Sequence, residues 1–444
     1  MSAKMKEKVF DYIEEKKDDV VDFLCRYLEY KSVNPGIPGK GQELEVQKWI
    51  SERFEEMGFD KVDYWAVDEE KKRPNVVSTI RGTGGGRSLI LNGHSDVVPV
   101  PEAQLRRWTV DPWKPTVKDG MVFGRGASDM KGGNAAMIWA AKALIDNDVR
   151  LKGDLFVECV PGEESNEGGT IGTASTVDRG YKAPFAIVVE PSNCEIQPIT
   201  PGAFFFELTV YGKEAHTGER NLVIFPQRYG VPTGPQVGVD AISKMVPYLQ
   251  FFQRLETQWN QRWRHEALGG GGYPTPDTQG TGVFTINPSF IEGGTYLGSV
   301  PGYCKLTCCV WYPSWLKGEE VWSEIRKHVD AIASTDDWLK EHPPEFKAPV
   351  ITHWEPNEIQ QDHEGCKILS KAWREATGRE PVISGFKAVC DVTYFGKRNI
   401  PAVVFGPGDL SMGVHGPDEY IPIDQLIKAS KTYAAMAMEW CGVV

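Results

Sequence analysis

The chain has 444 residues, a length that suggests two or three domains. Its composition is 41% hydrophobic and 25% charged with 46 glycines and 30 prolines, which excludes a disordered, collagen-like or coiled-coil chain. The formal net charge of −12 argues against a nucleic-acid partner, because nucleic acids select basic surfaces. Carboxylates that bind metal cations would account for part of this acidic excess.

The sequence also bears on location and on cysteine chemistry. It contains no apolar run long enough to span a membrane, and no apolar segment follows the lysines of the first eight residues. We therefore expect a cytoplasmic protein without a signal peptide and without membrane contact. The nine cysteines show no CxxC spacing, which argues against a disulfide framework and against a cysteine-based zinc site.

The first 60 residues show the apolar spacing of two amphipathic helices, and beyond them short apolar runs alternate with helical patterns. The expected strands lie at residues 76–80, 89–91, 121–123, 155–160, 186–189 and 402–405, and the expected helices at residues 132–148, 362–377 and 423–440. This alternation predicts an α/β domain in which helices cover both faces of a mixed sheet.

The middle of the chain follows a different pattern. We expect strands at residues 203–211, 282–290, 303–312 and near 349–353, and helices at residues 240–257 and 319–332. Two stretches rich in aromatic residues, glycine and proline, residues 219–236 and 259–279, lie between these elements. The pattern predicts that residues 201–354 form an inserted α+β domain, while residues 1–200 and 355–444 together form the α/β domain.

Histidines and acidic residues follow five of the expected strands. They are His94 and Asp96, then Asp129, then Glu163 and Glu164, then Glu190, and finally His415. Because sites in open α/β sheets lie beyond the carboxyl ends of the strands, we expect these side chains to meet at one edge. Crowded carboxylates need compensating positive charge, so the pattern predicts two divalent cations. Histidine and carboxylate ligands suit zinc, cobalt or manganese.

These five blocks, in this order and along almost the whole chain, resemble the M20 family of metallopeptidases and amidohydrolases. The resemblance implies that Asp129 bridges two metal ions, most often zinc. It implies that His94 and Glu190 hold one ion and that Glu164 and His415 hold the other. It also implies that the inserted domain is a ferredoxin-like lid through which two copies form a homodimer.

The same resemblance implies roles for three further residues. Asp96 would orient the metal ligand His94. Glu163 would be the general base that takes a proton from a metal-activated water and returns it to the leaving nitrogen. His216, in the sequence Gly-Lys-Glu-Ala-His-Thr-Gly, matches a lid histidine that faces the oxyanion, in many members from the partner subunit.

Three departures from the family pattern concern the substrate. Residues 297–301 read Leu-Gly-Ser-Val-Pro, without the usual asparagine, and Trp311 stands where the family often has an arginine that binds a carboxylate. Lys387 and Asp391 lie where the usual motif is Gly-Gly-Thr-Asp, of which only the aspartate and a preceding Ser384-Gly385 remain. Without that arginine, an α-carboxylate loses a bidentate partner. Lys387 either replaces the arginine or is a surface lysine, and the sequence favours a substrate with an apolar or aromatic portion.

The sequence therefore predicts a two-metal hydrolase that cleaves the amide C–N bond of a small molecule, such as an N-acyl amino acid or an acylated amine. A dipeptidase, and an aminohydrolase that deaminates an unusual aromatic substrate, are the alternatives among enzymes. A non-catalytic binding or dimerisation module is the alternative from a different class, and the intact carboxylate cluster argues against it. A serine hydrolase is disfavoured because no GxSxG motif is present.

Overall fold

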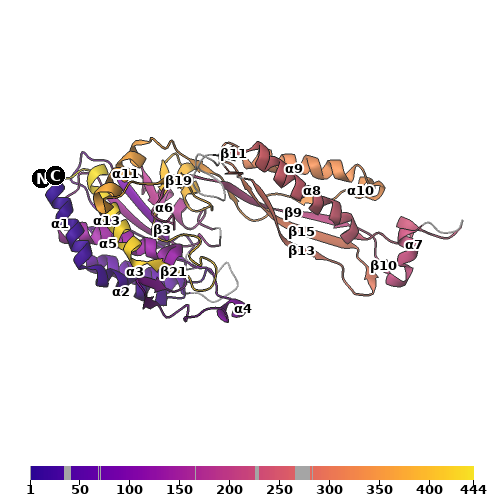
Figure 1. Cartoon of the computed structure of the whole chain (residues 1–444), viewed down its shortest axis with the longest axis horizontal. Coiled ribbons are helices and arrows are strands. Elements are labelled where there is room, and N and C mark those ends of the chain that lie inside the picture. Colours follow the sequence, from indigo (N-terminus) through magenta and orange to yellow (C-terminus); the bar gives the residue numbers. More distant parts are fainter. Residues whose placement is uncertain are drawn as a thin grey trace. The chain divides into compact units, whose positions relative to one another are not determined.

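The computed structural model describes residues 2–34, 42–68, 70, 72–165, 167–225, 230–265, 281–282 and 284–444. The chain divides into two compact units, the first made of Met1–Ile199 and Asn357–Val444 and the second of Thr200–Pro356 (Figure 1). Of the two stretches expected between elements of the inserted domain, residues 226–229 and 266–279 lie outside the described residues. No helix among the described residues combines the length and the apolar character that a membrane-spanning segment requires.

A nine-stranded mixed sheet forms the centre of the first unit. Its strands, in spatial order, are β1 (Lys61–Ala66), β2 (Pro74–Ile80), β6 (Leu155–Val160), β3 (Leu89–His94), β7 (Ala186–Val188), β20 (Ala402–Val404), β8 (Ile196–Thr200) and β18 (Asn357–Glu358), with β19 (Ile383–Gly385) paired to β8. The four central strands β6, β3, β7 and β20 run parallel to one another, so their carboxyl ends meet at the same edge. They are buried almost throughout, as strands covered on both faces must be.

Helices cover the two faces of this sheet. Val157 of β6 packs into the apolar cluster beneath α5 (Gly132–Asp146), whereas its neighbour Glu158 accepts a hydrogen bond from Thr176 of α6 (Thr173–Arg179). Because successive side chains of a strand point to opposite faces, α5 and α6 lie on opposite sides of the sheet. The predicted fold, an α/β domain with helices on both faces of a mixed sheet, is confirmed.

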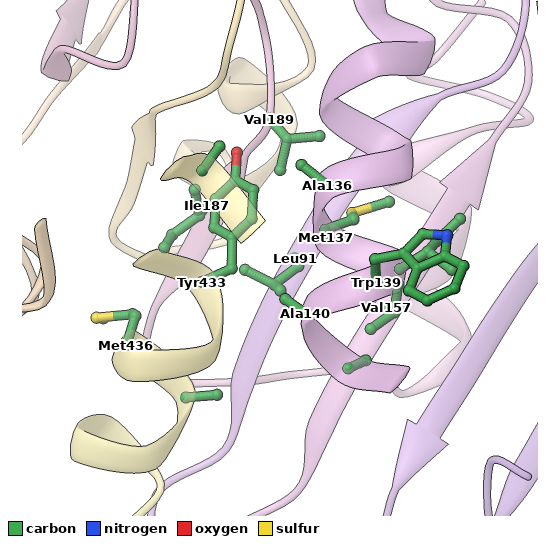
Figure 2. Close-up of a cluster of buried hydrophobic side chains, with 14 of the residues drawn as sticks. Leu91, Ala136, Met137, Trp139, Ala140, Val157, Ile187, Val189, Tyr433 and Met436 are labelled. Atoms are coloured by element: carbon green, nitrogen blue, oxygen red, sulfur yellow. The ribbon is translucent and has the colours of Figure 1, made fainter. Parts of the chain in front are cut away.

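The largest apolar cluster of the described residues lies between the sheet, α5 and α13 (Ile423–Trp440). Figure 2 shows Leu91 and Ile187 of the strands facing Ala136 and Ala140 of α5, with Tyr433 of α13 beside them. Alanines on α5 let the sheet and the second helix approach closely, since a small side chain fills little of the space between two elements. This packing fixes the start of α5, which directly follows the turn that carries Asp129.

The expectation of two helices in the first 60 residues is wrong. The described part of this segment forms three, α1 (Ser2–Glu15), α2 (Lys17–Glu29) and α3 (Glu43–Met57). The first two are separated at Lys16, where ψ rises to 12° within a run of charged residues. That run supplies no apolar side chain to continue the buried stripe, so the chain can change direction there without loss of burial.

The second unit contains a five-stranded antiparallel sheet. Its order is β13 (Thr285–Gly293), β15 (Tyr303–Tyr312), β9 (Gly202–Tyr211) and β16 (Glu345–Lys347), with β17 (His353–Trp354) also paired to β9. The helices α8 (Ala241–Arg262) and α9 (Gly318–Ala333) share an apolar cluster with the alternate buried residues of β9 and β15. The single strand expected near residues 349–353 is replaced by β16 and β17, two short pieces on either side of the cis bond at Pro349.

Candidate metal centre

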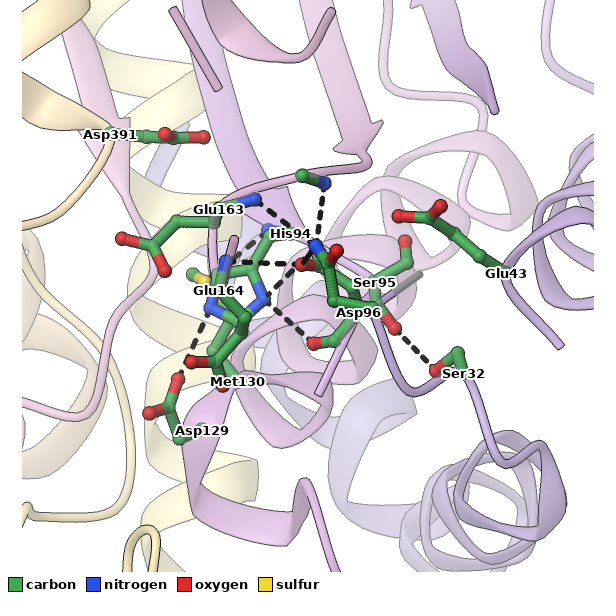
Figure 3. A network of polar contacts seen from close by, with 12 residues as sticks. Ser32, Glu43, His94, Ser95, Asp96, Asp129, Met130, Glu163, Glu164 and Asp391 are labelled. Atoms are coloured by element: carbon green, nitrogen blue, oxygen red, sulfur yellow. Dashed lines mark hydrogen bonds and ion pairs between the residues drawn. The ribbon is translucent and has the colours of Figure 1, made fainter. Parts of the chain in front are cut away.

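Loops at strand ends of the first unit bring predicted site residues together, and Figure 3 shows five of them: His94, Asp96, Asp129, Glu163 and Glu164. His94 is the last residue of β3, the loop after β6 carries Glu163 and Glu164, and Glu190 follows β7. The position of Asp129 differs from the expectation, because the strand that precedes it is not part of the nine-stranded sheet. Asp129 follows β5 (Met121–Phe123), which belongs to a separate three-stranded sheet with β4 (Thr116–Lys118) and β21 (Tyr420–Pro422). The loop before β21 carries His415.

Two groups of potential ligands form at this edge, and they share one residue. The first contains His94, Asp129 and Glu190, and the second contains Asp129, Glu164 and His415; within each group the ligand atoms lie within 4.8 Å of one another. His94 Nε2 lies 3.1 Å from Asp129 Oδ1 and 3.6 Å from Glu190 Oε1. His415 Nε2 lies 3.3 Å from Asp129 Oδ2 and 3.2 Å from Glu164 Oε2. Each of these nitrogen-and-oxygen donor sets fits a divalent cation.

The pKa values of the carboxylates in this cluster show that their ionised forms need nearby positive charge. Burial raises the pKa of Glu163, Glu164 and Glu190 above the ordinary glutamate value, and neighbouring carboxylates add to this effect. Burial also raises the pKa of Asp129, but hydrogen bonds from the two histidines outweigh it and hold that pKa well below its usual value. Protons on the histidines or divalent cations can supply the charge that these carboxylates require.

The backbone of Asp96 orients the ring of His94. The Nδ1 atom of His94 lies 2.9 Å from the main-chain oxygen of Asp96, whereas the nearer carboxylate oxygen is 3.7 Å away. A carbonyl oxygen can only accept, so Nδ1 carries the proton of the neutral ring. In the protonated ring Nε2–H donates to Asp129, whereas in the neutral ring the lone pair of Nε2 points toward Asp129 and Glu190, as a metal ligand requires.

The carboxylate of Asp96 has a different set of partners. Its Oδ1 accepts hydrogen bonds from the backbone N–H of Gly162 at 3.0 Å and of Glu163 at 3.4 Å. Its Oδ2 accepts from the N–H of Glu164 at 3.0 Å and from Asn34 Nδ2 at 2.6 Å. This fully buried carboxylate therefore holds the loop that carries Glu163 and Glu164, a contact that the sequence does not indicate.

The remaining sequence-predicted residues belong to both units, and Asp391 of the first unit lies close enough to the cluster for its charge, in addition to burial, to raise the pKa of Glu163 and Glu190 (Figure 3). Asp391 is buried in the first unit and accepts a hydrogen bond from Thr173 Oγ1 at 2.6 Å, and burial raises its pKa to about 6. Lys387 is exposed on the same unit. His216 and Trp311 belong to the second unit, where His216 is exposed on β10 (Ala215–His216) and Trp311 lies on the less buried face of β15.

The structure adds buried charged residues that the sequence did not single out. Arg125 and Glu419 form a fully buried ion pair next to Asp129, and Glu158 is fully buried in β6. The signal for Glu419 is its position four residues after His415, within the same block. For Glu158, the signal is a single charged residue within an otherwise apolar strand sequence.

The first unit is thus an α/β domain with two overlapping groups of potential metal ligands beyond its strand ends. Residues 90–439 match the model of peptidase family M20/M25/M40. The N-formyl-4-amino-5-aminomethyl-2-methylpyrimidine deformylase of Halalkalibacterium halodurans is 33% identical over 98% of this chain and 97% of that protein. The Bacillus subtilis deformylase of the same name is 32% identical over 97% and 96%. Human carnosine dipeptidase 1 has the same fold, with a TM-score of 0.69 at 15% identity over 98% of this chain and 99% of that one.

The chain belongs to the M20 family of peptidases. It is a hydrolase that acts on C–N bonds, as the sequence predicted. The two groups of potential metal ligands described above lie within the part of the chain that matches the family model.

Glu158 generates a prediction about pH. Its Oε2 accepts hydrogen bonds from Asn92 Nδ2 at 2.9 Å and Thr176 Oγ1 at 3.0 Å, and burial raises its pKa to about 8. An unfolded glutamate titrates near pH 4.3, so the folded protein holds this proton more tightly than the unfolded chain does. The contribution of this group to stability is therefore present at low pH and is lost as the pH rises toward 8.

We expect Glu158→Gln, which imitates the protonated acid, to match the parent at about pH 4 and below, where the unfolded glutamate is also largely protonated, and to exceed it in stability at pH 8 to 9, by an amount of the order of a few kcal/mol. Urea unfolding of both proteins across this pH range measures the difference. The exposed residue Glu55 provides a matched control, because Glu55→Gln should follow the parent curve at every pH. Parallel curves for Glu158→Gln and the parent would show that Glu158 is ionised in the folded protein.

Proposed function

We propose that this chain is a two-metal amidohydrolase. His94 and Glu190 would hold one divalent cation, Glu164 and His415 would hold the other, and Asp129, which belongs to both groups of ligands, would serve both. The observation that carries this proposal is the carboxylate of Asp129, whose two oxygens each face a different histidine at 3.1 and 3.3 Å. Zinc is the proposed metal, and cobalt or manganese fits the same donors. Bound divalent cations lower the pKa of a water and polarise a carbonyl group.

Glu163 is the proposed general base. It is adjacent to the ligand Glu164, and both lie in the loop whose backbone Asp96 holds. Burial raises the pKa of Glu163, which brings this carboxylate closer to the range in which it can both accept and return a proton. Glu163 takes the proton of the attacking water and delivers it to the leaving nitrogen.

We propose an N-formylated or otherwise N-acylated aminomethylpyrimidine, or a similar acylated aromatic amine, as the substrate. The two deformylases are similar to this chain along nearly its whole length. The compound in their name is an aromatic amine whose name includes no carboxylate, which agrees with Trp311 in place of a carboxylate-binding arginine. An N-acyl amino acid would instead need a cationic partner such as Lys387.

His216 is the proposed oxyanion donor, acting from the second unit across a homodimer. Its Nδ1 accepts a hydrogen bond from the N–H of Gly218 at 3.0 Å, so the neutral ring carries its proton on Nε2. Nε2–H is the donor that an oxyanion requires. The second unit also offers a surface for dimer formation, because the edge strand β13 exposes Phe290 and Ile291 at 76% and 54%.

Replacing the proposed base tests the mechanism. Glu163→Gln keeps the shape of the side chain but cannot accept a proton, so we expect kcat to fall by about 10²-fold or more. Elemental analysis should still find two divalent ions per chain. Glu102→Gln, at an exposed position, is the control and should behave as the parent. Activity of Glu163→Gln within a few-fold of the parent would assign the base to another residue.

A panel of substrates tests the specificity. We expect the highest kcat/KM for the N-formylated aminomethylpyrimidine, with lower values for acetylornithine and for a dipeptide. Lys387→Ala should leave kcat/KM for the pyrimidine within about twofold, because an exposed side chain without a role changes little. If acetylated amino acids are the best substrates and Lys387→Ala raises their KM, the assignment to aromatic amines is wrong.

Mixed dimers test the role of His216. His216→Ala and Glu163→Gln are each expected to be nearly inactive. If His216 acts on the partner subunit, mixing the two variants creates dimers with one complete site and restores part of the activity. Differently tagged subunits verify the exchange. No restoration after verified exchange would place the action of this histidine within its own chain or remove it from catalysis.

A further inference from the structure

Glu419 is fully buried between the loop of His415 and β21, and all its partners belong to the segment that carries Asp129. Its Oε1 accepts hydrogen bonds from the backbone N–H of Ser128 at 2.9 Å and of Asp129 at 3.0 Å. Its Oε2 accepts from the N–H of Gly126 at 2.8 Å and from Arg125 Nη1 at 2.6 Å. The backbone of Asp129 is not helical, with φ −118° and ψ 97°, so this carboxylate rather than a regular helix holds it.

Arg125 connects Glu419 to the segment of His415. The guanidinium is 1% exposed, and its Nη2 donates to the carbonyl oxygen of Gly416 and to Gln104 Oε1, both at 3.0 Å. Gln104 in turn donates from Nε2 to the carbonyl oxygen of His415 at 2.7 Å. One buried ion pair is thus hydrogen-bonded to the backbones of both segments.

His415 adopts a backbone conformation that needs such support. Its φ is +57°, in the left-handed region that side chains other than glycine rarely occupy. This conformation is strained and persists where the surroundings enforce it. The bonds to the carbonyl groups of His415 and Gly416 provide that enforcement, and they place His415 Nε2 at 3.3 Å from Asp129 Oδ2.

We propose that Arg125, Glu419 and Gln104 are positioning residues that set the placement of Asp129 relative to His415. They contact no proposed ligand atom; they act through the backbones of the two ligands. Because Asp129 belongs to both donor groups, Glu419 controls both proposed metal sites. Arg125 and Gln104 control chiefly the site that contains His415. The inference rests on the proposed function, since it takes Asp129 and His415 to be metal ligands.

A role in fold stability alone makes different predictions. An intact buried ion pair contributes little or nothing to stability. Removing one partner leaves the other charge buried and unpaired, which destabilises the whole fold and favours neither metal site over the other. Three conservative changes separate the two roles. Glu419→Gln keeps one acceptor oxygen but loses the second. Arg125→Lys keeps the charge beside Glu419, but an ammonium group lacks the fork that reaches Gln104 and Gly416 together. Gln104→Ala removes only the bonds to His415 and Arg125.

The experiment is a Zn²⁺ titration of the full chain after metal removal, in competition with a chromophoric chelator. The parent should bind two ions per chain. Gln104→Ala and Arg125→Lys should weaken one of the two binding events by about 10- to 100-fold, with the other within a few-fold of the parent. Glu419→Gln should weaken both. Glu439→Gln, which breaks contacts to Lys6 and Lys371 in the same unit, is the matched control and should lower only the Tm.

The outcomes distinguish this inference from the proposed function. A parent that binds fewer than two ions overturns the proposed function. A parent that binds two ions, with variants that lose Tm but keep both affinities, makes the network structural and overturns the inference alone. If Glu419→Gln does not fold, Gln104→Ala decides, because Gln104 is only partly buried and lies in the short helix α4 (Glu102–Leu105).

Discussion

Repulsion among buried carboxylates at one edge of the sheet is the constraint on which the arrangement of the first unit depends. Asp129, Glu163, Glu164 and Glu190 converge there, and burial makes each negative charge costly. Such a cluster would spread apart if its loops were free to move. Two further buried carboxylates prevent this, because Asp96 and Glu419 gather the backbone N–H groups of the loops that carry the cluster. Two buried carboxylates that accept main-chain hydrogen bonds therefore hold the loops on which the clustered carboxylates lie.

The residues proposed for chemistry and for substrate binding are divided unevenly between the two units, since His216 belongs to the second and Lys387 to the first. The proposed ligands and base lie in the first unit, on loops fixed by the parallel strands and by α5. Trp311, one of the departures that concern the substrate, lies in the second unit, on a sheet whose apolar cluster is its own. Changes of substrate within one family can therefore accumulate in the second unit without disturbing the donor groups.

Much of the fold and of the site could be predicted from the sequence, because strong signals mark them. Buried parallel strands are continuous apolar runs, and polar residues directly after them stand out, as His94 and Glu190 do. The sequence predicts the strand β5 at residues 121–123, but its place in a separate sheet could not be predicted, since three residues carry no pattern that identifies their partner strands. The partners of Asp96 and Glu419 could not be predicted either. A backbone N–H has no sequence signature, so only the structure shows which loop each carboxylate holds.

The ends of the second unit show how it is joined to the first. The chain leaves the first unit at the end of β8 and returns at β18, and these two strands are neighbours in the same sheet. The N–H of Ile359 donates to the carbonyl oxygen of Pro198 at 3.0 Å, so a hydrogen bond joins the segment that leaves the first unit to the segment that returns to it. To the first unit, residues 200–356 are topologically equivalent to a long loop between two neighbouring strands. Loop-closure entropy grows only slowly with length, so an ancestral sheet could have acquired this domain at little thermodynamic cost, and a short turn would suffice to close the sheet in its place.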